Sequence, residues 1–491
     1  MIFSDIKYKS YLPIYISAII YFVAAFFFSY SIDISMIDDG LRHIAFAANL
    51  DVMKNWGEVF PKSLFSEYDP WHNWHLLIAL FLKIFSYETV HIVINTVVLF
   101  VLMLLIDSHI RRKINYDFKT LIYLVVFSIV IFSFIRYLNL RPDLLSGLYV
   151  LFVLLLRNKF WPVFIITLIY GPFYYVYYIY SAFLGLTFLI QKKYKQFFGI
   201  FLASILVLIY YLVNDGTAFI EVVKYVLTDQ QLRNGLNVSE SMPLFKFLTN
   251  INSKLLLVVF VLIVSIILYY KYSFFKERTL ELFILISSIL WLNQGRFFYL
   301  FLPIIIIVVF SYIIDCDKKK FFNQVRKYLI FTKKYINYSS KVKLFYFIVI
   351  PYSIFMFAYG FSTYTYKNEL IDGKLFQAEE FNNKTILLNR MNVDIYKALY
   401  FNPTLHFVPS CGIGWFDNSD KQMKDLYVKL QKKGLNEEEL YTFIKYVNTD
   451  FYIHYSGNEE QILDFKKLEN YGIIAQKINK NRIIFSIDKN K

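Results

Sequence analysis

The stretch Leu12–Ser31, LPIYISAIIYFVAAFFFSYS, decides the fold of this chain. It carries no charge, and at about 1.5 Å per residue a helix of this length crosses a hydrocarbon core about 30 Å thick. Two aspartates, Asp38 and Asp39, follow shortly after it. The run is too long for the core of a signal peptide, and no small-residue cleavage site follows it. It therefore predicts a retained membrane helix.

The composition predicts a polytopic membrane protein, because 57% of the 491 residues are hydrophobic and 20% are aromatic. The net charge of +15 is spread over loops between apolar runs. Such positive charges set topology and meet anionic lipid heads, and their scatter argues against a nucleic-acid partner. The bias towards Lys, Asn, Ile, Phe and Tyr suggests an AT-rich, bacterial source. Cys316 and Cys411 are expected on opposite sides of the membrane, so no disulfide or cysteine metal site is predicted.

Further apolar runs bring the number of predicted spans to about eleven. They lie near 12–31, 88–107, 119–136, 143–156, 160–172, 173–190, 197–213, 255–270, 279–293, 297–314 and 344–361. Gly171-Pro172 breaks the fifth and sixth runs apart, and both outer ends of this pair carry positive residues. A tight hairpin whose two ends lie on one side is therefore expected.

The positive-inside rule orients these spans with the N-terminus in the cytoplasm and the C-terminus outside. Clusters of Lys and Arg after the second and eighth spans and in 315–343 fall on the inner side, whereas the acids of 33–88 fall on the outer side. The expected division is a transmembrane domain, 1–361, with a first outer loop at 32–87, and a small extracytoplasmic α/β domain, 362–491. Strands are predicted at 385–389, 450–456 and 482–488, and helices at 420–433, 436–447 and 457–468.

Two short amphipathic helices are predicted on the outer surface within the first loop. Residues 71–86, WHNWHLLIALFLKIFS, are rather short for a span, and treating them as one would reverse the charge pattern downstream. Residues 39–54 form the other, in which Asp39 is a candidate cap and the apolar side faces the membrane.

Asp38 and Asp39 are the first candidate catalytic residues. An ionised carboxylate near a membrane costs free energy unless it is solvated or has a function. A carboxylate at this position is a candidate base for an acceptor hydroxyl or a candidate ligand for a divalent metal. Arg42 and His43 lie one turn further along, and His43 shares a helical face with Asp39. The alternative is a capped surface helix with solvated acids and an ordinary interfacial histidine.

A second group of polar residues surrounds two tryptophans at 67–75. Glu67 and Asp69 precede the tryptophans, and His72 and His75 are spaced to share one helical face. These histidines, together with carboxylates from 38–39, are candidate metal ligands. The alternatives are sugar binding by Trp71 and Trp74, with His72 and Glu67 as hydrogen-bonding groups, and packing against lipid headgroups.

Two arginines are expected on the outer side, against the positive-inside trend. Arg141 lies in Arg141-Pro142-Asp143 after the third span, and Arg296 lies between the ninth and tenth. The phosphate of a lipid carrier is a natural partner for both. For Arg141, an ion pair with Asp143 or Glu67 is an equal alternative.

The order of three short motifs relative to the spans resembles the GT-C superfamily of integral membrane glycosyltransferases. The motifs are DDGLRH at 38–43, RPD at 141–143 and GRFF at 295–298. The superfamily includes protein mannosyltransferases, aminoarabinose transferases of lipid A and catalytic subunits of oligosaccharyltransferases. The resemblance covers the architecture of nearly the whole chain.

The resemblance implies a polyprenyl-phosphate-linked sugar donor, transfer on the outer face, and a first-loop aspartate as base or metal ligand. That role corresponds to Asp38 or Asp39, with Mg or Mn as the metal, and a helping acid corresponds to Glu67 or Asp69. The expected enzyme is a hexosyl- or pentosyltransferase of the bacterial cell envelope that acts on a lipid, glycan or protein acceptor. No WWD-type motif follows residue 362, so transfer to Asn sequons is not expected.

The chemistry agrees with this expectation, because direct displacement of a polyprenyl phosphate needs only alignment, a proton acceptor and a neutralised leaving group, and it inverts the anomeric carbon. A polysaccharide polymerase or ligase is the closer alternative, although such enzymes usually lack a terminal soluble domain. A transporter or flippase of lipid-linked sugars is the second alternative function. Its acids would lie near the midplane, and its halves would show a repeat that this sequence lacks.

Overall fold

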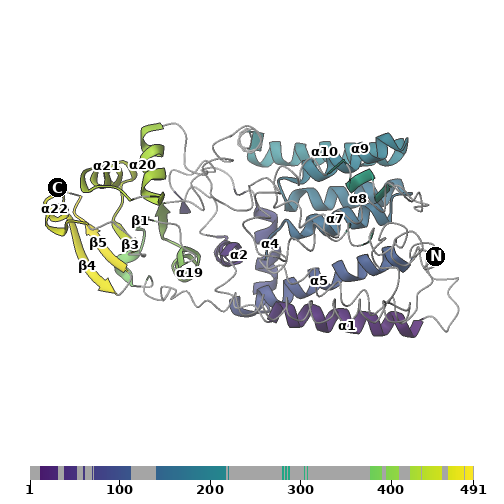
Figure 1. The fold of residues 1–491 in the computed structure, drawn as a ribbon, viewed down its shortest axis with the longest axis horizontal. Helices are drawn as coiled ribbons and strands as arrows, with labels where there is room; N and C mark the ends of the chain where they lie inside the picture. Colours follow the sequence, from purple (N-terminus) through teal and green to yellow (C-terminus); the bar gives the residue numbers. More distant parts are fainter. Residues whose placement is uncertain are drawn as a thin grey trace, which may run out of the picture.

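The computed structural model is mostly helical, with a mixed β-sheet near the C-terminus (Figure 1). It describes residues 11–30, 38–51, 59–60, 69, 71–111, 140–216, 219–220, 279–280, 282–284, 286–287, 304, 307, 376, 378–389, 394–408, 421–432, 434–455, 463–479 and 482–489. The predicted spans near 119–136, 255–270 and 344–361 lie outside these residues, so the number of eleven spans stays a prediction.

The described helices of the bundle match the apolar runs of the sequence. They are α1 (Tyr11–Tyr30), α5 (Tyr87–Arg111), α7 (Leu144–Leu155), α8 (Phe160–Tyr170), α9 (Tyr177–Ile190) and α10 (Tyr194–Asp215). Within the described part of the chain, α5 and residues Tyr194–Asn214 of α10 are long and apolar enough to cross a membrane by length and composition. Figure 1 shows these helices side by side along the long axis of the molecule.

Helices α1 and α5 form an antiparallel pair. Phe22 of α1 meets the ring of Phe100 edge to face at 5.7 Å between centroids, and Arg111 near the end of α5 donates to Ser17 near the start of α1 at 2.7 Å. The side of α1 that faces away from the core is as apolar as the side within it, since Phe22 and Phe26 are exposed. An apolar exposed side is what a lipid-facing helix requires.

The predicted hairpin is confirmed by the way α8 and α9 pack on α10. Phe160 at the start of α8 lies against Gly199, and Gly171 at its end lies against Val207, so α8 runs parallel to α10. Tyr177 at the start of α9 donates to the Ser204 carbonyl at 2.9 Å, and Gly185 further along lies against Phe197, so α9 runs antiparallel to α10. The chain reverses in a short 3₁₀ turn, η4 (Gly171–Phe173).

The hairpin helices are shorter than full spans. At about 1.5 Å per residue, α8 and α9 are about 16 Å and 21 Å long, against a hydrocarbon core of about 30 Å. Inside the protein, three hydroxyls satisfy one another, because Tyr149 of α7 contacts Thr167 of α8 at 3.1 Å and Ser181 of α9 at 3.0 Å. These contacts join the hairpin to α7 without an unsatisfied polar group at Tyr149.

Two short helices of the first loop, α2 (Asp38–Ala48) and α4 (His72–Leu82), lie between the bundle and the C-terminal sheet (Figure 1). Helix α4 ends after eleven residues, too few to cross a membrane, as the sequence predicts. Its Asn73 side chain donates to the Pro172 carbonyl at 2.9 Å. The turn of the hairpin and the first loop therefore share one end of the bundle.

The C-terminal sheet has the order β2-β1-β3-β5-β4. Its strands are β1 (Thr385–Leu388), β2 (His406–Val408), β3 (Phe451–Tyr455), β4 (Ile473–Asn479) and β5 (Arg482–Ile487). Strand β1 is parallel to β2 and β3, whereas β5 is antiparallel to β3 and β4. The predicted strands at 385–389, 450–456 and 482–488 are confirmed as β1, β3 and β5.

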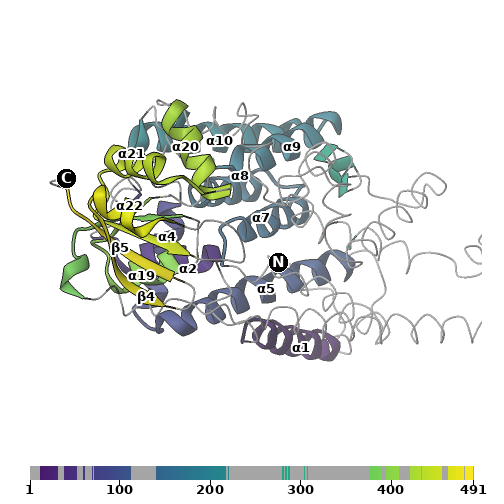
Figure 2. The same cartoon turned by 60° about the vertical axis from the view of Figure 1, so that its left-hand side comes forward.

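Helices cover both faces of the sheet (Figure 2). Helices α20 (Lys421–Lys432) and α21 (Glu437–Val447) confirm two predictions, whereas α22 (Phe465–Asn470) begins later than expected and α19 (Asp394–Phe401) was not expected. Ile386 and Leu388 belong to the same core cluster as the bundle, and Leu387 between them belongs to the core under α20 and α21. Strand β1 is therefore buried on both faces, which explains its uninterrupted apolar sequence.

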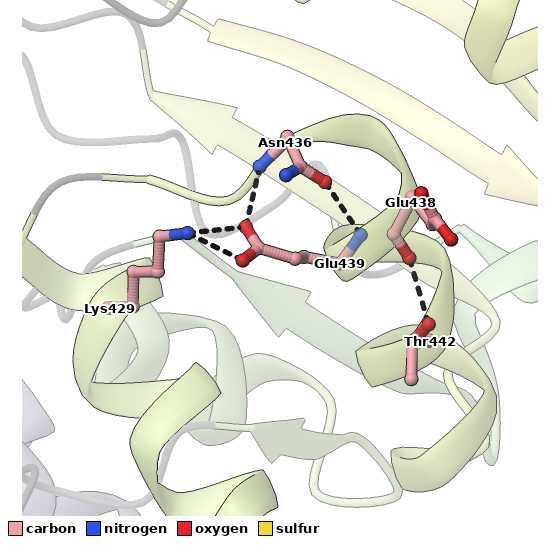
Figure 3. Close-up of polar contacts among 5 residues, drawn as sticks. All are labelled: Lys429, Asn436, Glu438, Glu439 and Thr442. Carbon is pink, nitrogen blue, oxygen red and sulfur yellow. Dashed lines mark hydrogen bonds and ion pairs between the residues drawn. The ribbon is translucent and has the colours of Figure 1, made fainter.

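The start of α21 is fixed by a capping box, drawn in Figure 3. The Asn436 side chain accepts from the Glu439 N–H at 2.9 Å, and the Glu439 carboxylate accepts from the Asn436 N–H at 3.1 Å. Lys429 of α20 forms an ion pair with the same carboxylate and lowers the pKa of Glu439. The Glu439 side chain therefore caps the start of α21 and also links α21 to α20.

The first prediction concerns Gly171, where a Cβ would lie 2.5 Å from Val207 Cγ2. We expect Gly171→Ala to lower the free energy of unfolding by about 1–3 kcal/mol, because the stiff Val207 side chain cannot move aside. Thermal unfolding of the purified protein in detergent measures this. Gly147→Ala is the matched control, since its Cβ would lie at an ordinary 3.8 Å from Leu102.

The double variant Gly171→Ala with Val207→Ala separates crowding from a general effect on the turn. Removal of the two Val207 methyl groups should restore part of the lost stability despite the cavity that it leaves. A Gly171→Ala protein as stable as the Gly147→Ala control would contradict the close packing of η4 on α10.

Candidate functional site

The Arg141-Pro142-Asp143 turn lies beside the first loop, at the same end of the bundle. The Trp74 indole of α4 donates to the Leu140 carbonyl at 3.1 Å, and Leu140 adopts a positive φ of 47°. Asp143 is buried just before α7 begins, and Arg141 is half-buried. The prediction that this turn and the first loop lie on one side is therefore confirmed. The side of the membrane on which they lie stays a prediction.

The C-terminal domain lies at this same end. Helix α19 packs against α2, and the ring of Tyr400 lies 4.5 Å from the ring of Tyr87 at the start of α5. Asn49, just after α2, also donates to the Leu399 carbonyl at 3.5 Å. The first loop and the C-terminal domain thus share one side, as the odd span count predicts.

Helix α2 is not the amphipathic surface helix that the sequence predicts. Residues 40–47 are all buried, because α4 covers the helix from one side and α19 from another. The sequence pattern could not show this, since the covering helix lies about 350 positions later in the chain. Arg42 and His43, which the sequence predicts on that surface helix, are consequently inside the protein.

Three side chains inside the first loop form one hydrogen-bonded chain. His43 Nδ1 lies 2.8 Å from His75 Nε2, and His75 Nδ1 lies 2.7 Å from Asp69 Oδ2. The other Asp69 oxygen, Oδ1, accepts from the Trp71 backbone N–H at 3.0 Å. His43 is 1% exposed and His75 is 0% exposed, so both contacts lie away from solvent. The chain joins α2 to α4.

Arg42 and Trp71 complete the surroundings of His43. The Arg42 guanidinium lies 4.8 Å above the Trp71 ring, a cation–π contact, and Trp71 meets the His43 ring edge to face at 5.6 Å. Burial, followed by the charge of Arg42 and then His75, holds the pKa of His43 well below 6.5. His43 is therefore neutral at neutral pH.

The structure brings together some of the predicted site residues and separates others. Asp38 and Asp39 are the first two residues of α2, and their side chains lie outside the described part of the chain. Glu67 and Arg296 are also outside it. Asp69, His43 and His75 are in direct contact, which the sequence did not predict.

The predicted pairing of His72 with His75 is wrong. His72 is exposed at the first position of α4, whereas His75 is buried and uses both ring nitrogens. His75 therefore has no nitrogen left for a metal or a substrate. The alternative of sugar binding by Trp71 and Trp74 is not supported by this structure, because both rings are buried.

A divalent metal has no complete set of ligands among the described side chains. No group of three or more His, Cys, Asp or Glu residues able to hold an ion occurs among them. Asp38 and Asp39 stay the predicted ligands, with His43 one turn along the same helix.

The burial of the two linked histidines predicts their chemical reactivity. Diethyl pyrocarbonate modifies accessible neutral imidazoles, so we expect rapid modification of His72 and little of His43 or His75 in the folded protein. Peptide mass analysis after brief treatment measures each site. After unfolding in denaturant, all three should react. Equal modification of His72 and His75 in the folded protein would contradict the described packing of α4.

Comparison with known proteins identifies the fold. No protein-family model matches the chain, and no curated protein matches it by sequence. Among solved structures, the apo oligosaccharyltransferase of Archaeoglobus fulgidus aligns with a TM-score of 0.54 at 12% identity, over 91% of this chain and 70% of that one. The same archaeal enzyme, AglB, in complex with an inhibitory peptide and a dolichol-phosphate aligns with a TM-score of 0.54 at 13% identity, over the same shares.

Another structure of the Archaeoglobus fulgidus enzyme, tethered to an acceptor peptide with an NVT sequon, gives a TM-score of 0.55 at 12% identity, over 91% of this chain and 69% of that one. ArnT from Cupriavidus metallidurans, bound to undecaprenyl phosphate, aligns over 97% of both chains at 10% identity, but its TM-score of 0.49 is too low to add to the assignment. The likeness to the archaeal oligosaccharyltransferase shows that this chain has the GT-C fold.

Proposed function

We propose that this protein is an integral membrane glycosyltransferase that moves a sugar from a polyprenyl-phosphate carrier to an acceptor. The observation that carries the proposal is the shared fold with AglB, an oligosaccharyltransferase whose structures hold a dolichol-phosphate and an acceptor peptide. Fold alone does not define an activity, so the residues at the shared end of the bundle supply the second support.

The arrangement of that end suits a charged lipid headgroup. Asp38 and Asp39 begin a helix held from two sides, and the Arg141 turn is fixed to α4 through the Trp74 hydrogen bond. We assign Arg141 to the phosphate of the donor, since a guanidinium matches phosphate geometry. Arg296 is a second candidate for the same phosphate. A displacement reaction is faster when the charged groups are held in fixed positions, because less entropy is then lost in orienting donor and acceptor.

The proposed reaction is a direct displacement. A hydroxyl of the acceptor attacks the anomeric carbon, and the bond between that carbon and the phosphate oxygen breaks. The proton of the hydroxyl passes to a base of the protein, and the polyprenyl phosphate departs with its negative charge next to an arginine. Attack opposite the leaving group inverts the anomeric configuration. A divalent ion held by Asp38 and Asp39, if bound, would neutralise phosphate charge.

The proposal extends to location and substrate class. The site lies on the outer face of a bacterial cytoplasmic membrane, and the acceptor belongs to the cell envelope. The transferred sugar is a hexose or a pentose. The absence of a WWD-type motif after residue 362 favours an acceptor other than an Asn sequon, which distinguishes this chain from its structural neighbour.

The test uses Asp38→Asn, Asp39→Asn and the double variant. Purified protein is incubated with undecaprenyl phosphate-linked hexoses and pentoses and with a membrane extract as acceptor, with and without chelator. We expect the rate of transfer by the double variant to fall by about 100-fold or more. The two carboxylates that it lacks act in the wild type while charge separates in the transition state. Mass analysis of the released undecaprenyl phosphate and of the modified acceptor measures turnover.

Asp51→Asn is the matched control, because Asp51 is an exposed acid of the same loop, shortly after α2. It should leave turnover unchanged. Full turnover in the Asp38→Asn, Asp39→Asn double variant would remove both carboxylates from the mechanism. Movement of intact lipid-linked sugar across a vesicle membrane, with no product formed, would instead identify a flippase.

A further inference from the structure

The base of the α8–α9 hairpin, at the end opposite the η4 turn, carries a concentration of positive charge. The positive residues there precede α8 or lie around the start of α10, and they are Arg157, Lys159, Lys192, Lys193 and Lys195. The sequence has no Asp or Glu between Asp143 and Asp215. The hairpin and α10 therefore supply no carboxylate of their own to balance these five charges.

Close helix packing brings Lys159 and Lys195 near each other. The Phe160 carbonyl oxygen lies 3.5 Å from the position that a Cβ of Gly199 would take, so the start of α8 touches α10. Lys159 comes just before Phe160, and Lys195 lies one turn before Gly199 on the same side of α10. Because α8 and α10 run parallel, both lysines stand at the same end of the helix pair.

These positions are unfavourable for a positive charge. Lys159 is the N-cap residue of α8, and Lys195 belongs to the first turn of α10, where the helix dipole is also positive. Both side chains are exposed, and neither forms an ion pair within the part of the chain that the structure describes. An anion bound between the two lysines would offset their mutual repulsion and the repulsion from the helix starts.

The positive-inside rule accounts for the presence of these charges but not for their arrangement. Membrane topology requires only that Lys and Arg lie near the ends of the spans. Positive residues anywhere in the two loops would serve it equally well. The rule does not require two lysines to meet at the starts of two helices that touch at Gly199.

The surroundings of the two lysines identify the kind of anion. Trp161, in the first turn of α8, is 66% exposed, and Ile165 and Ile169 continue the same exposed side at intervals of four residues. Phe198 of α10 is also exposed. An exposed tryptophan beside lysines at the end of an apolar helix is typical of a membrane–water interface. A ligand that suits both features has a phosphate and acyl chains.

We propose that Lys159 and Lys195 bind the phosphate of an anionic phospholipid, whose acyl chains lie along Trp161 and the exposed side of α8. The site is distinct from the candidate site at the first loop, because α8, about 16 Å long, separates it from η4. It does not depend on the proposed glycosyl transfer. The bound lipid would stabilise the contact between the starts of α8 and α10.

The test measures lipid binding to the purified full-length protein in a neutral detergent. Native mass spectrometry counts the phosphatidylglycerol molecules that stay bound as the lipid is titrated. We expect Lys159→Gln with Lys195→Gln to weaken the tightest binding by about tenfold or more, since each lysine near a membrane surface adds attraction to anionic lipid. Phosphatidylcholine, which has a phosphate but no net charge, should bind equally weakly to both proteins.

The matched control is Lys421→Gln with Lys466→Gln. It removes the same charge from two exposed lysines of the C-terminal domain. Its affinity for phosphatidylglycerol should equal that of the wild type. Equal affinity of the wild type and the Lys159→Gln, Lys195→Gln variant would overturn the proposal, as would the same loss of affinity in the control.

Thermal unfolding separates a lipid site from a purely structural role of the lysines. A ligand that binds the folded state raises the melting temperature, so phosphatidylglycerol should raise it in the wild type and the control but not in the Lys159→Gln, Lys195→Gln variant. Without lipid, that variant should be at least as stable as the wild type, because two positive charges have left helix starts. Lower stability without lipid would show that the lysines serve packing and would overturn the proposal.

Inorganic phosphate tests the assignment to a lipid. At the same concentration as the phosphatidylglycerol, it should leave the melting temperature of the wild type unchanged, because it lacks the acyl chains that contact α8. An equal rise with inorganic phosphate would identify a site for free phosphate and overturn the lipid assignment. Phosphatidylglycerol brominated on its acyl chains should quench the fluorescence of the wild type more than that of Trp161→Phe, and equal quenching would contradict the contact with Trp161.

Discussion

The burial of α2 between α4 and α19 is the constraint on which the candidate site depends. A helix whose sequence carries DDGLRH would lie in solvent if only the first loop surrounded it. The C-terminal domain removes that solvent by placing Ala398 and Leu399 of α19 near the helix. Charged and titratable side chains of α2 must then find partners inside the protein, because an unpaired buried polar group is costly. The local arrangement of the site follows from this requirement.

Several buried polar groups among the described residues of the first loop meet this requirement. Arg42 lies over the Trp71 ring, which keeps its charge next to an electron-rich face. Asp69 accepts from the Trp71 N–H and contacts His75, so both of its oxygens are used. His43 Nε2 is a buried atom with no hydrogen-bond partner among the described residues. The burial of α2 therefore leaves one of the two His43 nitrogens without the hydrogen bond that water would supply at a surface.

The sequence predicted what depends on local pattern and missed what depends on distant contacts. Helices α1 and α5, the hairpin at Gly171-Pro172 and strands β1, β3 and β5 follow from apolar runs and a turn signal, and all are confirmed. The burial of α2 was missed because α19 covers it from far along the chain. The pairing of His72 with His75 failed because only His75 turns inward. Two buried histidines 32 positions apart carry no sequence pattern that links them to Asp69.

The sheet shows why the C-terminal domain and the bundle are one packing unit in this structure. The predicted boundary near residue 362 lies outside the described residues, so it stays a prediction. On β1, however, alternate side chains serve different cores: Ile386 and Leu388 join the cluster that continues through α2 into the bundle, while Leu387 joins α20 and α21. A strand buried on both faces cannot lose one of its layers without exposing apolar surface. The domain therefore covers the candidate site through the same apolar contacts that stabilise its own sheet, and any motion of it relative to α2 must break part of that shared core.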